Sequence, residues 1–129
     1  NSNQQFIYSL RRMLDPIKEH VDNNFNPLPA EYTKEFAPVR QKINDLMRMS
    51  CEQIETSRYE NYREILAEAD ACKDELSVLR KKHIDRIQHL SDNSLMQISL
   101  VYLNVLQESQ EFLSVMRHQL RAAKKFMEK

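Results

Sequence analysis

The side chains best suited to chemistry in this sequence are its four histidines and its carboxylates, which could together bind a transition metal. A di-iron or di-manganese site in a helical bundle uses Glu-x-x-His pairs, because a three-residue step places both ligands on one inward face of a helix. None of the histidines has an acidic residue three positions earlier. The residues there are Ile17, Arg80, Arg86 and Val115, ahead of His20, His83, His89 and His118 respectively. The spacing argues against a ferritin-like metal centre.

His83 is the histidine of most interest, because helical phase places it among apolar residues in the middle of the segment 59–90. We interpret it as a core histidine that is hydrogen-bonded to a neighbouring group. The alternative is a metal ligand or a proton switch.

Carboxylates repeat along the same segment. Glu60, Glu64 and Glu68 recur every four positions, with Asp70 and Asp74 beside them. Such a row could hold a hydrated divalent cation. Most of these residues project away from the apolar stripe, which is typical of a solvated helix face, and we assign no metal ligands.

Nucleophilic catalysis has no recognisable constellation in this sequence. Ser, His and Asp are scattered, and Cys51 and Cys72 stand twenty residues apart without a CxxC pair, so neither a zinc site nor a redox dithiol is indicated. We expect both cysteines to be small buried side chains in a reducing compartment. The expectation is a protein without catalytic activity and without a cofactor.

Composition favours helices throughout. The 129 residues include no Gly and four Pro, so tight hairpin turns are nearly unavailable, and 29% of the positions are charged. The 19 basic and 19 acidic residues balance, which argues against a nucleic-acid binder. There is no run of eighteen apolar residues and no signal peptide. Because the chain opens on Asn1 and not on Met, we expect a piece of a longer protein.

Apolar residues at three- and four-residue steps predict four amphipathic helices, at about 2–24, 31–56, 59–90 and 94–127. Pro16 interrupts the first stripe, but the stripe keeps its phase, so we expect a kinked continuous helix. Pro38 is expected to be tolerable because it lies near the start of the second helix. The stripe of the last helix comprises Leu95, Ile98, Tyr102, Val105, Phe112, Met116, Leu120 and Met127.

The breaks between these segments contain residues that suit loops and caps. The segment 23–29 carries Pro27 and Pro29, and each X-Pro step pushes the preceding residue out of helical geometry. Residues 56–57 (TS) and 91–93 (SDN) offer side-chain oxygens to the amides of the following helix. Four helices with short connections predict an all-α, antiparallel four-helix bundle that forms a single domain over 1–129.

Charge is segregated along the chain. Eight acidic residues lie between Glu52 and Glu75 against only three basic ones, whereas the tail after Ser114 carries five basic residues and one acidic residue. The five are Arg117, Arg121, Lys124, Lys125 and Lys129. These regions could pair with each other, or the tail could contact an acidic partner or anionic lipid headgroups. Part of the tail's charge simply suits the negative end of a helix.

The order of residues resembles a known family. The stretches 84–87 (IDRI), 91–94 (SDNS) and 100–108 (LVYLNVLQE) resemble the last two helices of PhoU-like domains fused to bacterial inorganic phosphate transporters. Upstream, 6–10 (FIYSL) and 20–24 (HVDNN) resemble a helix and an asparagine-bearing loop of the same region.

The resemblance implies a helical bundle on the cytoplasmic side of the bacterial inner membrane, carried by a sodium- or proton-coupled phosphate transporter. Its function would be to regulate transport or to link it to phosphate signalling, through protein partners that include its own transporter domain. It would meet the membrane only through that attached domain.

PhoU-type proteins often carry a Glu/Asp-x-x-x-Asp motif that binds metal clusters, and this sequence departs from it. The matching positions in the last helix are Gln110 and Ser114, with Val115 where a histidine would follow. The resemblance therefore transfers no metal ligands. The alternative function is a free-standing helical scaffold or sensor that dimerises or binds another protein through an exposed apolar strip.

Overall fold

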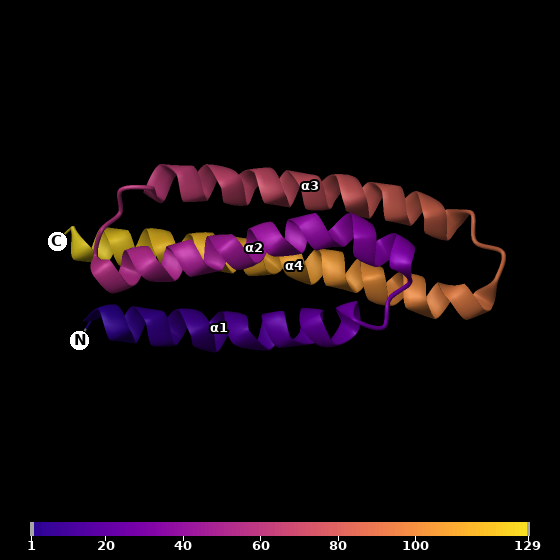
Figure 1. Ribbon diagram of the computed structural model, residues 1–129, viewed down its shortest axis with the longest axis horizontal. Coiled ribbons are helices and arrows are strands. Elements are labelled where there is room, and N and C mark those ends of the chain that lie inside the picture. The colour runs from indigo at the N-terminus through magenta and orange to yellow at the C-terminus, as the bar shows by residue number, and fades with distance from the viewer. Residues whose placement is uncertain (1, 129) are drawn as a thin grey trace.

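The computed structural model describes residues 2–128 and contains four α-helices and no strand within that range. They are α1 (Ser2–Phe25), α2 (Ala30–Thr56), α3 (Tyr62–Gln88) and α4 (Asn93–Met127). The helices alternate in direction, and the two chain ends lie at the same end of the molecule (Figure 1). The predicted all-α, antiparallel four-helix bundle is therefore confirmed.

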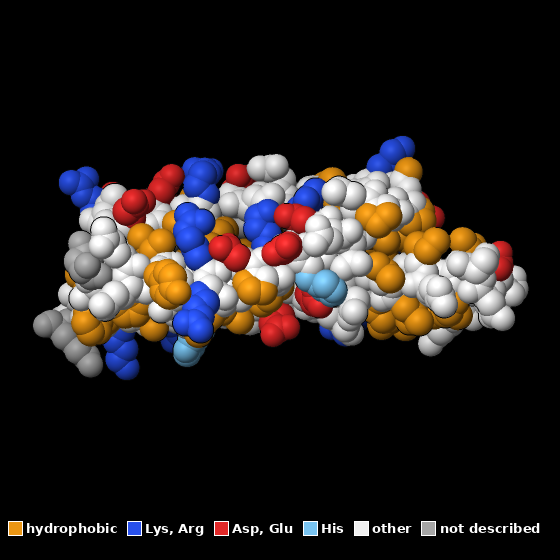
Figure 2. Space-filling model, turned by 90° about the horizontal axis from the view of Figure 1, so that it is seen from below, with side chains coloured by type: hydrophobic (Ala, Val, Ile, Leu, Met, Phe, Trp, Pro, Cys, Tyr) orange, Lys and Arg blue, Asp and Glu red, His pale blue; other side chains and the backbone are white. Residues whose placement is uncertain are grey.

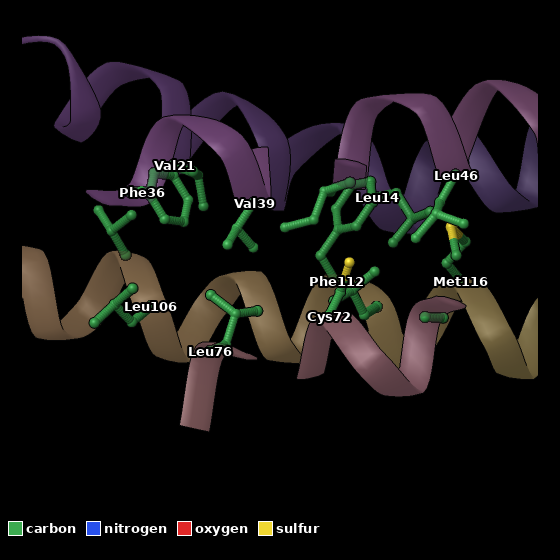
Figure 3. Packing of buried hydrophobic residues seen from close by; sticks show 14 of the residues in the cluster. Leu14, Val21, Phe36, Val39, Leu46, Cys72, Leu76, Leu106, Phe112 and Met116 are labelled. Carbon is green, nitrogen blue, oxygen red and sulfur yellow. The ribbon is translucent and has the colours of Figure 1, made fainter. Parts of the chain in front are cut away.

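The helices α2 and α4 lie across the short diagonal of the bundle. Among the described residues α4 contacts each of the other three helices, α2 also contacts all three, and α1 and α3 do not touch each other. The cross-section is thus a rhombus whose short diagonal joins α2 to α4. Apolar side chains from both sides meet between the helices: Phe36 lies opposite Leu106, and Leu14 and Leu46 lie opposite Phe112 and Met116 (Figure 3).

Both prolines lie within continuous helices. Pro16 is inside α1, and Pro38 is inside α2, eight positions after its first residue, which is deeper than expected from the sequence. Each proline deprives the carbonyl four residues earlier of its helical partner. Pro16 and Pro38 are both exposed, as are Arg12 and Lys34, so water can satisfy those two carbonyls.

The predicted capping residues behave differently at the two breaks. Asp92 caps α4, because its side chain accepts a hydrogen bond from the Ser94 amide at 2.8 Å. Thr56 and Ser57 do not cap α3. Ser57 instead ends α2 in a left-handed conformation, with φ 57°, and α3 begins only at Tyr62 rather than at 59 because the chain first turns through 57–61.

The prediction for the apolar stripe of the last helix is correct for its middle residues, which are buried, but wrong for the residues at its two ends. Leu95, Ile98 and Met127 are 44%, 37% and 40% exposed. Leu95 and Ile98 continue the helical phase of the buried stripe. Leu95 lies beyond the start of α2, and Ile98 lies level with the first turn of α2, so α2 covers the first not at all and the second only in part. The hydrogen bond between Tyr32 and Ser99 places these two residues at the same height in the bundle. α2 begins two residues before Tyr32, whereas α4 begins six residues before Ser99. α4 therefore extends four residues, or about 6 Å, beyond the start of α2. The α3–α4 hairpin projects accordingly beyond the α1–α2 turn (Figure 1).

No helix among residues 2–128 combines the length and the apolar character that crossing a lipid bilayer requires.

Candidate functional site

The main concentration of polar side chains inside the bundle lies where α2, α3 and α4 meet, near the α3–α4 hairpin. We call it the polar cluster, and it consists of Tyr32, Glu35, His83, Arg86, Ser99 and Tyr102. Tyr32 and Glu35 come from α2, His83 and Arg86 from α3, and Ser99 and Tyr102 from α4. In each pair the two residues are three positions apart, so each helix directs both side chains to the same side.

Glu35 is the centre of the hydrogen bonds in this cluster. Arg86 donates to both carboxylate oxygens, at 2.6 and 2.8 Å, Tyr102 donates its hydroxyl hydrogen at 2.8 Å, and Lys82 donates at 3.1 Å. The Glu35 side chain is only 13% exposed. Burial alone raises the pKa of Glu35, but the hydrogen bonds from Arg86, Tyr102 and Lys82 outweigh it and hold that pKa at about 2. Glu35 is therefore a stable carboxylate and a poor general base.

His83 is fully buried, and its hydrogen bonds define its tautomer. Nε2 lies 2.7 Å from the Ser99 carbonyl oxygen, which can only accept, so Nε2 carries the hydrogen. Nδ1 lies 3.4 Å from Arg86 Nη1 and accepts from it. Burial lowers the pKa of His83, and the nearby Arg86 charge lowers it further, although the Ser99 carbonyl opposes this. His83 is thus a neutral core histidine, which agrees with the interpretation from the sequence.

Aromatic contacts hold the same residues in place. The rings of Tyr32 and Tyr102 are stacked with centroids 4.7 Å apart, and His83 meets both rings edge-on at 4.8 and 4.7 Å. The Tyr32 hydroxyl lies 3.2 Å from Ser99 Oγ. Burial raises the pKa of Tyr102, and its hydrogen bond to Glu35 raises it further, so this phenol stays protonated. The hydroxyl, carboxylate, guanidinium and imidazole groups are all engaged with one another.

This arrangement has little capacity for acid–base chemistry. A general acid or base works best when its pKa lies near the operating pH, whereas Glu35, His83 and Tyr102 are each held in one protonation state. The cluster instead fastens α2 to the α3–α4 hairpin. Such a network favours one register of the three helices, because any slip would leave buried polar groups unpaired.

The sequence pointed to His83 but missed its partners. Tyr32 and Tyr102 were recognised as members of apolar stripes, and a buried tyrosine usually needs a partner for its hydroxyl. That requirement signals polar partners for Tyr32 and Tyr102 without identifying them, since Glu35 accepts from Tyr102, sixty-seven positions away in the chain. Ser99 could have been noticed as a polar residue between Ile98 and Tyr102 in the stripe.

The acidic residues of the segment 60–74 do not converge on a metal site. Glu60, Glu64 and Glu68 are exposed, and Asp70 bonds to Arg117 on α4 at 3.2 Å. Within residues 2–128, no group of three or more His, Cys, Asp or Glu side chains is placed to hold a metal ion. The Asp70–Arg117 ion pair shows that the acidic segment and the basic tail do meet, at one point.

Gln110 is part of the α3–α4 interface. Its Nε2 donates to the Lys73 carbonyl at 3.0 Å and to Ser77 Oγ at 2.8 Å, and its Oε1 accepts from Arg80 at 3.1 Å. Gln110 therefore joins two helices.

The two cysteines lie inside the bundle. Cys51 and Cys72 are buried free thiols, and burial raises the pKa of each.

In the basic tail, Lys124 pairs with Glu128 and lies 5.0 Å from the centre of the Tyr62 ring. Lys129 falls outside the described residues.

No protein-family model, curated protein or solved structure matches this chain.

Proposed function

We propose that this chain is a non-catalytic regulatory or interaction domain of an inorganic phosphate transporter, acting through the surfaces of its helices on the cytoplasmic side of a bacterial inner membrane. The observation that carries the non-catalytic part is the polar cluster. Its ionisable groups are hydrogen-bonded to one another and are held in fixed protonation states. This supports a function that works by binding at the surface of the bundle.

The phosphate-transporter part rests on the resemblance of 84–87, 91–94 and 100–108 to PhoU-like domains. The bundle architecture is compatible with that resemblance. Because both chain ends lie at one end of the bundle (Figure 1), either can join a membrane-embedded domain while the long sides of the helices stay free for partners.

The test is phosphate uptake by cells that carry the gene encoding this chain, intact or with the codons for residues 1–129 deleted. We expect both products to reach the membrane in similar amounts, and we expect the deletion to abolish the fall in uptake that normally follows phosphate repletion. Unchanged control of uptake would contradict the regulatory function, and a gene product without membrane-spanning segments would contradict the attachment to a transporter.

A second candidate function, a scaffold that forms homodimers, is favoured by one observation. Leu95 and Ile98 expose core-type side chains in the first two turns of α4, next to the α3–α4 connection. Hydrophobic side chains also gather toward the end of the molecule away from the chain termini (Figure 2). Association of two hairpins would bury this surface.

A further inference from the structure

An open cleft lies at the other end of the bundle, between the start of α3 and the last turns of α4. Its volume is about 470 Å³. Tyr62, the first residue of α3, forms one side, and α4 forms the other with His118, Arg121, Ala122, Lys124, Lys125 and Glu128. We call it the basic cleft. Lysine and arginine side chains project at this end of the molecule, near the terminal residues (Figure 2).

The charges lining the basic cleft do not balance. Arg121, Lys124 and Lys125 are opposed by one carboxylate, Glu128, and that carboxylate already pairs with Lys124. Arg121 and Lys125 are exposed, and within the described residues neither forms an ion pair or a hydrogen bond through its side chain. Two uncompensated positive charges therefore face the cleft.

Helix electrostatics account for only part of this charge. The negative end of a helix dipole favours basic residues within the last turn, which explains Lys124 and Lys125 because α4 ends at Met127. Arg121 and His118 lie six and nine positions before that end. Asp70 neutralises Arg117, one turn before Arg121, whereas nothing comparable neutralises Arg121.

The donors around the basic cleft are those that recognise phosphate groups. A guanidinium can donate two parallel hydrogen bonds to an oxyanion, and an ammonium adds a point charge. The Tyr62 phenol and the His118 imidazole supply further donors, and Ala122 is the only aliphatic side chain in the lining. The volume admits a phosphate with a small attached group.

We propose that the basic cleft binds a phosphate-bearing anion, held principally by Arg121 and Lys125 with Tyr62 and His118 as additional donors. The anion is either a soluble phosphate or phosphate ester, or the headgroup of an anionic phospholipid. The inference does not depend on the attachment to a transporter, since the cleft is formed by this chain alone.

The first experiment is a titration of the isotopically labelled chain with inorganic phosphate and with glycerol 3-phosphate, followed by NMR. Saturable shifts of the amides of Tyr62 and of residues 118–125 are expected, and they should weaken as NaCl is added because the charges are exposed. A parallel arm measures co-sedimentation with phosphatidylcholine vesicles, with and without phosphatidylglycerol. Saturation by the soluble anions alone identifies a soluble ligand, whereas binding only to the phosphatidylglycerol vesicles identifies a headgroup.

The variant Arg121→Gln/Lys125→Gln is compared with Lys34→Gln/Lys81→Gln, which removes the same charge from exposed residues on α2 and α3. We expect the first variant to lose affinity by about tenfold or more, as expected from the loss of two charge-assisted contacts, and the second to bind like the wild type. Circular dichroism should show the same melting temperature for both, because none of the substituted side chains forms an ion pair or a hydrogen bond within residues 2–128. Absence of saturable binding in every arm, or equal losses in the two variants, would overturn the proposal.

Discussion

At the scale of single residues, Glu35 determines how this bundle responds to acid. Its pKa is about 2 in the folded chain and close to 4.5 when unfolded. A carboxyl group with a lowered folded pKa stabilises the fold above the unfolded value, and this contribution is lost as the pH falls from about 4.5 toward 2. His83 acts in the same direction, because its folded pKa is below 6.5. Its contribution is complete above pH 6.5 and declines as the pH falls below that value.

We therefore predict that the free energy of unfolding decreases continuously as the pH is lowered from 6.5. Glu35→Gln should reduce the dependence below about pH 4.5, and the part that remains belongs to Asp22 and Asp92, whose pKa values are also lowered by their hydrogen bonds. At neutral pH the variant should be less stable by about 2 kcal/mol, because Arg86 stays half-buried and keeps only the exposed Glu31 carboxylate, 3.5 Å away, as an anionic partner. Urea unfolding at a series of pH values measures both effects. In the variant, the free energy of unfolding should still fall with pH in the range that belongs to His83. If the variant's curve is instead parallel to that of the wild type at every pH, the assignment to Glu35 is contradicted.

His83 could be predicted from the sequence and Glu35 could not, for a physical reason. Helical phase identifies which residues point inward, and His83 stands among apolar neighbours. Glu35 lies next to Phe36 at the edge of the stripe, where charged residues usually reach solvent. Its burial depends on Arg86, fifty-one positions later in the chain, and no local pattern contains that information.

At the scale of elements, the sequence predicted the type and number of helices, whereas their ends required tertiary information. Periodicity gives the direction of a side chain around the helix axis but not its height relative to neighbouring helices. Leu95 has the right direction but lies beyond the start of α2, and Ile98 is level with the first turn of α2, where the bundle ends. The connection between α2 and α3 was also harder to place, since a chain without glycine must use another residue for a left-handed turn.

Ser57 is that residue, and its conformation yields a prediction. A residue with a Cβ pays about 1 kcal/mol or more to adopt the left-handed region, and glycine does not. We expect Ser57→Gly to raise the free energy of unfolding by about 0.5–1 kcal/mol, even though it removes the 2.7 Å hydrogen bond from Asn3 to the Ser57 hydroxyl. Chemical denaturation measures the change.

The matched control is Ser57→Ala, which removes the same hydroxyl but keeps the Cβ. It should be less stable than the wild type, so the difference between the two variants isolates the backbone effect. If glycine and alanine destabilise the chain equally, the left-handed turn stores no strain.

At the scale of the whole molecule, the projecting α3–α4 hairpin governs self-association in the scaffold hypothesis. That hypothesis predicts a mass in sedimentation equilibrium that rises with concentration, and a variant Leu95→Gln/Ile98→Gln that stays monomeric. Val78→Gln is the control, because Val78 is also exposed but lies on the outer side of α3. A wild-type chain that is monomeric at every concentration would contradict homodimerisation.

The shared location of the chain ends has a mechanical consequence. Because α1 and α4 are antiparallel neighbours and their outer ends lie together, a force that draws the two termini apart acts across the α1–α4 contact and not along it. The ring pair of Phe6 and Phe126, with centroids 5.3 Å apart, is among the contacts at this end that would carry the load early. Under tension α1 and α4 would separate one helical turn after another, starting at the termini. The polar cluster, at the opposite end of the bundle, would be the last part to come apart.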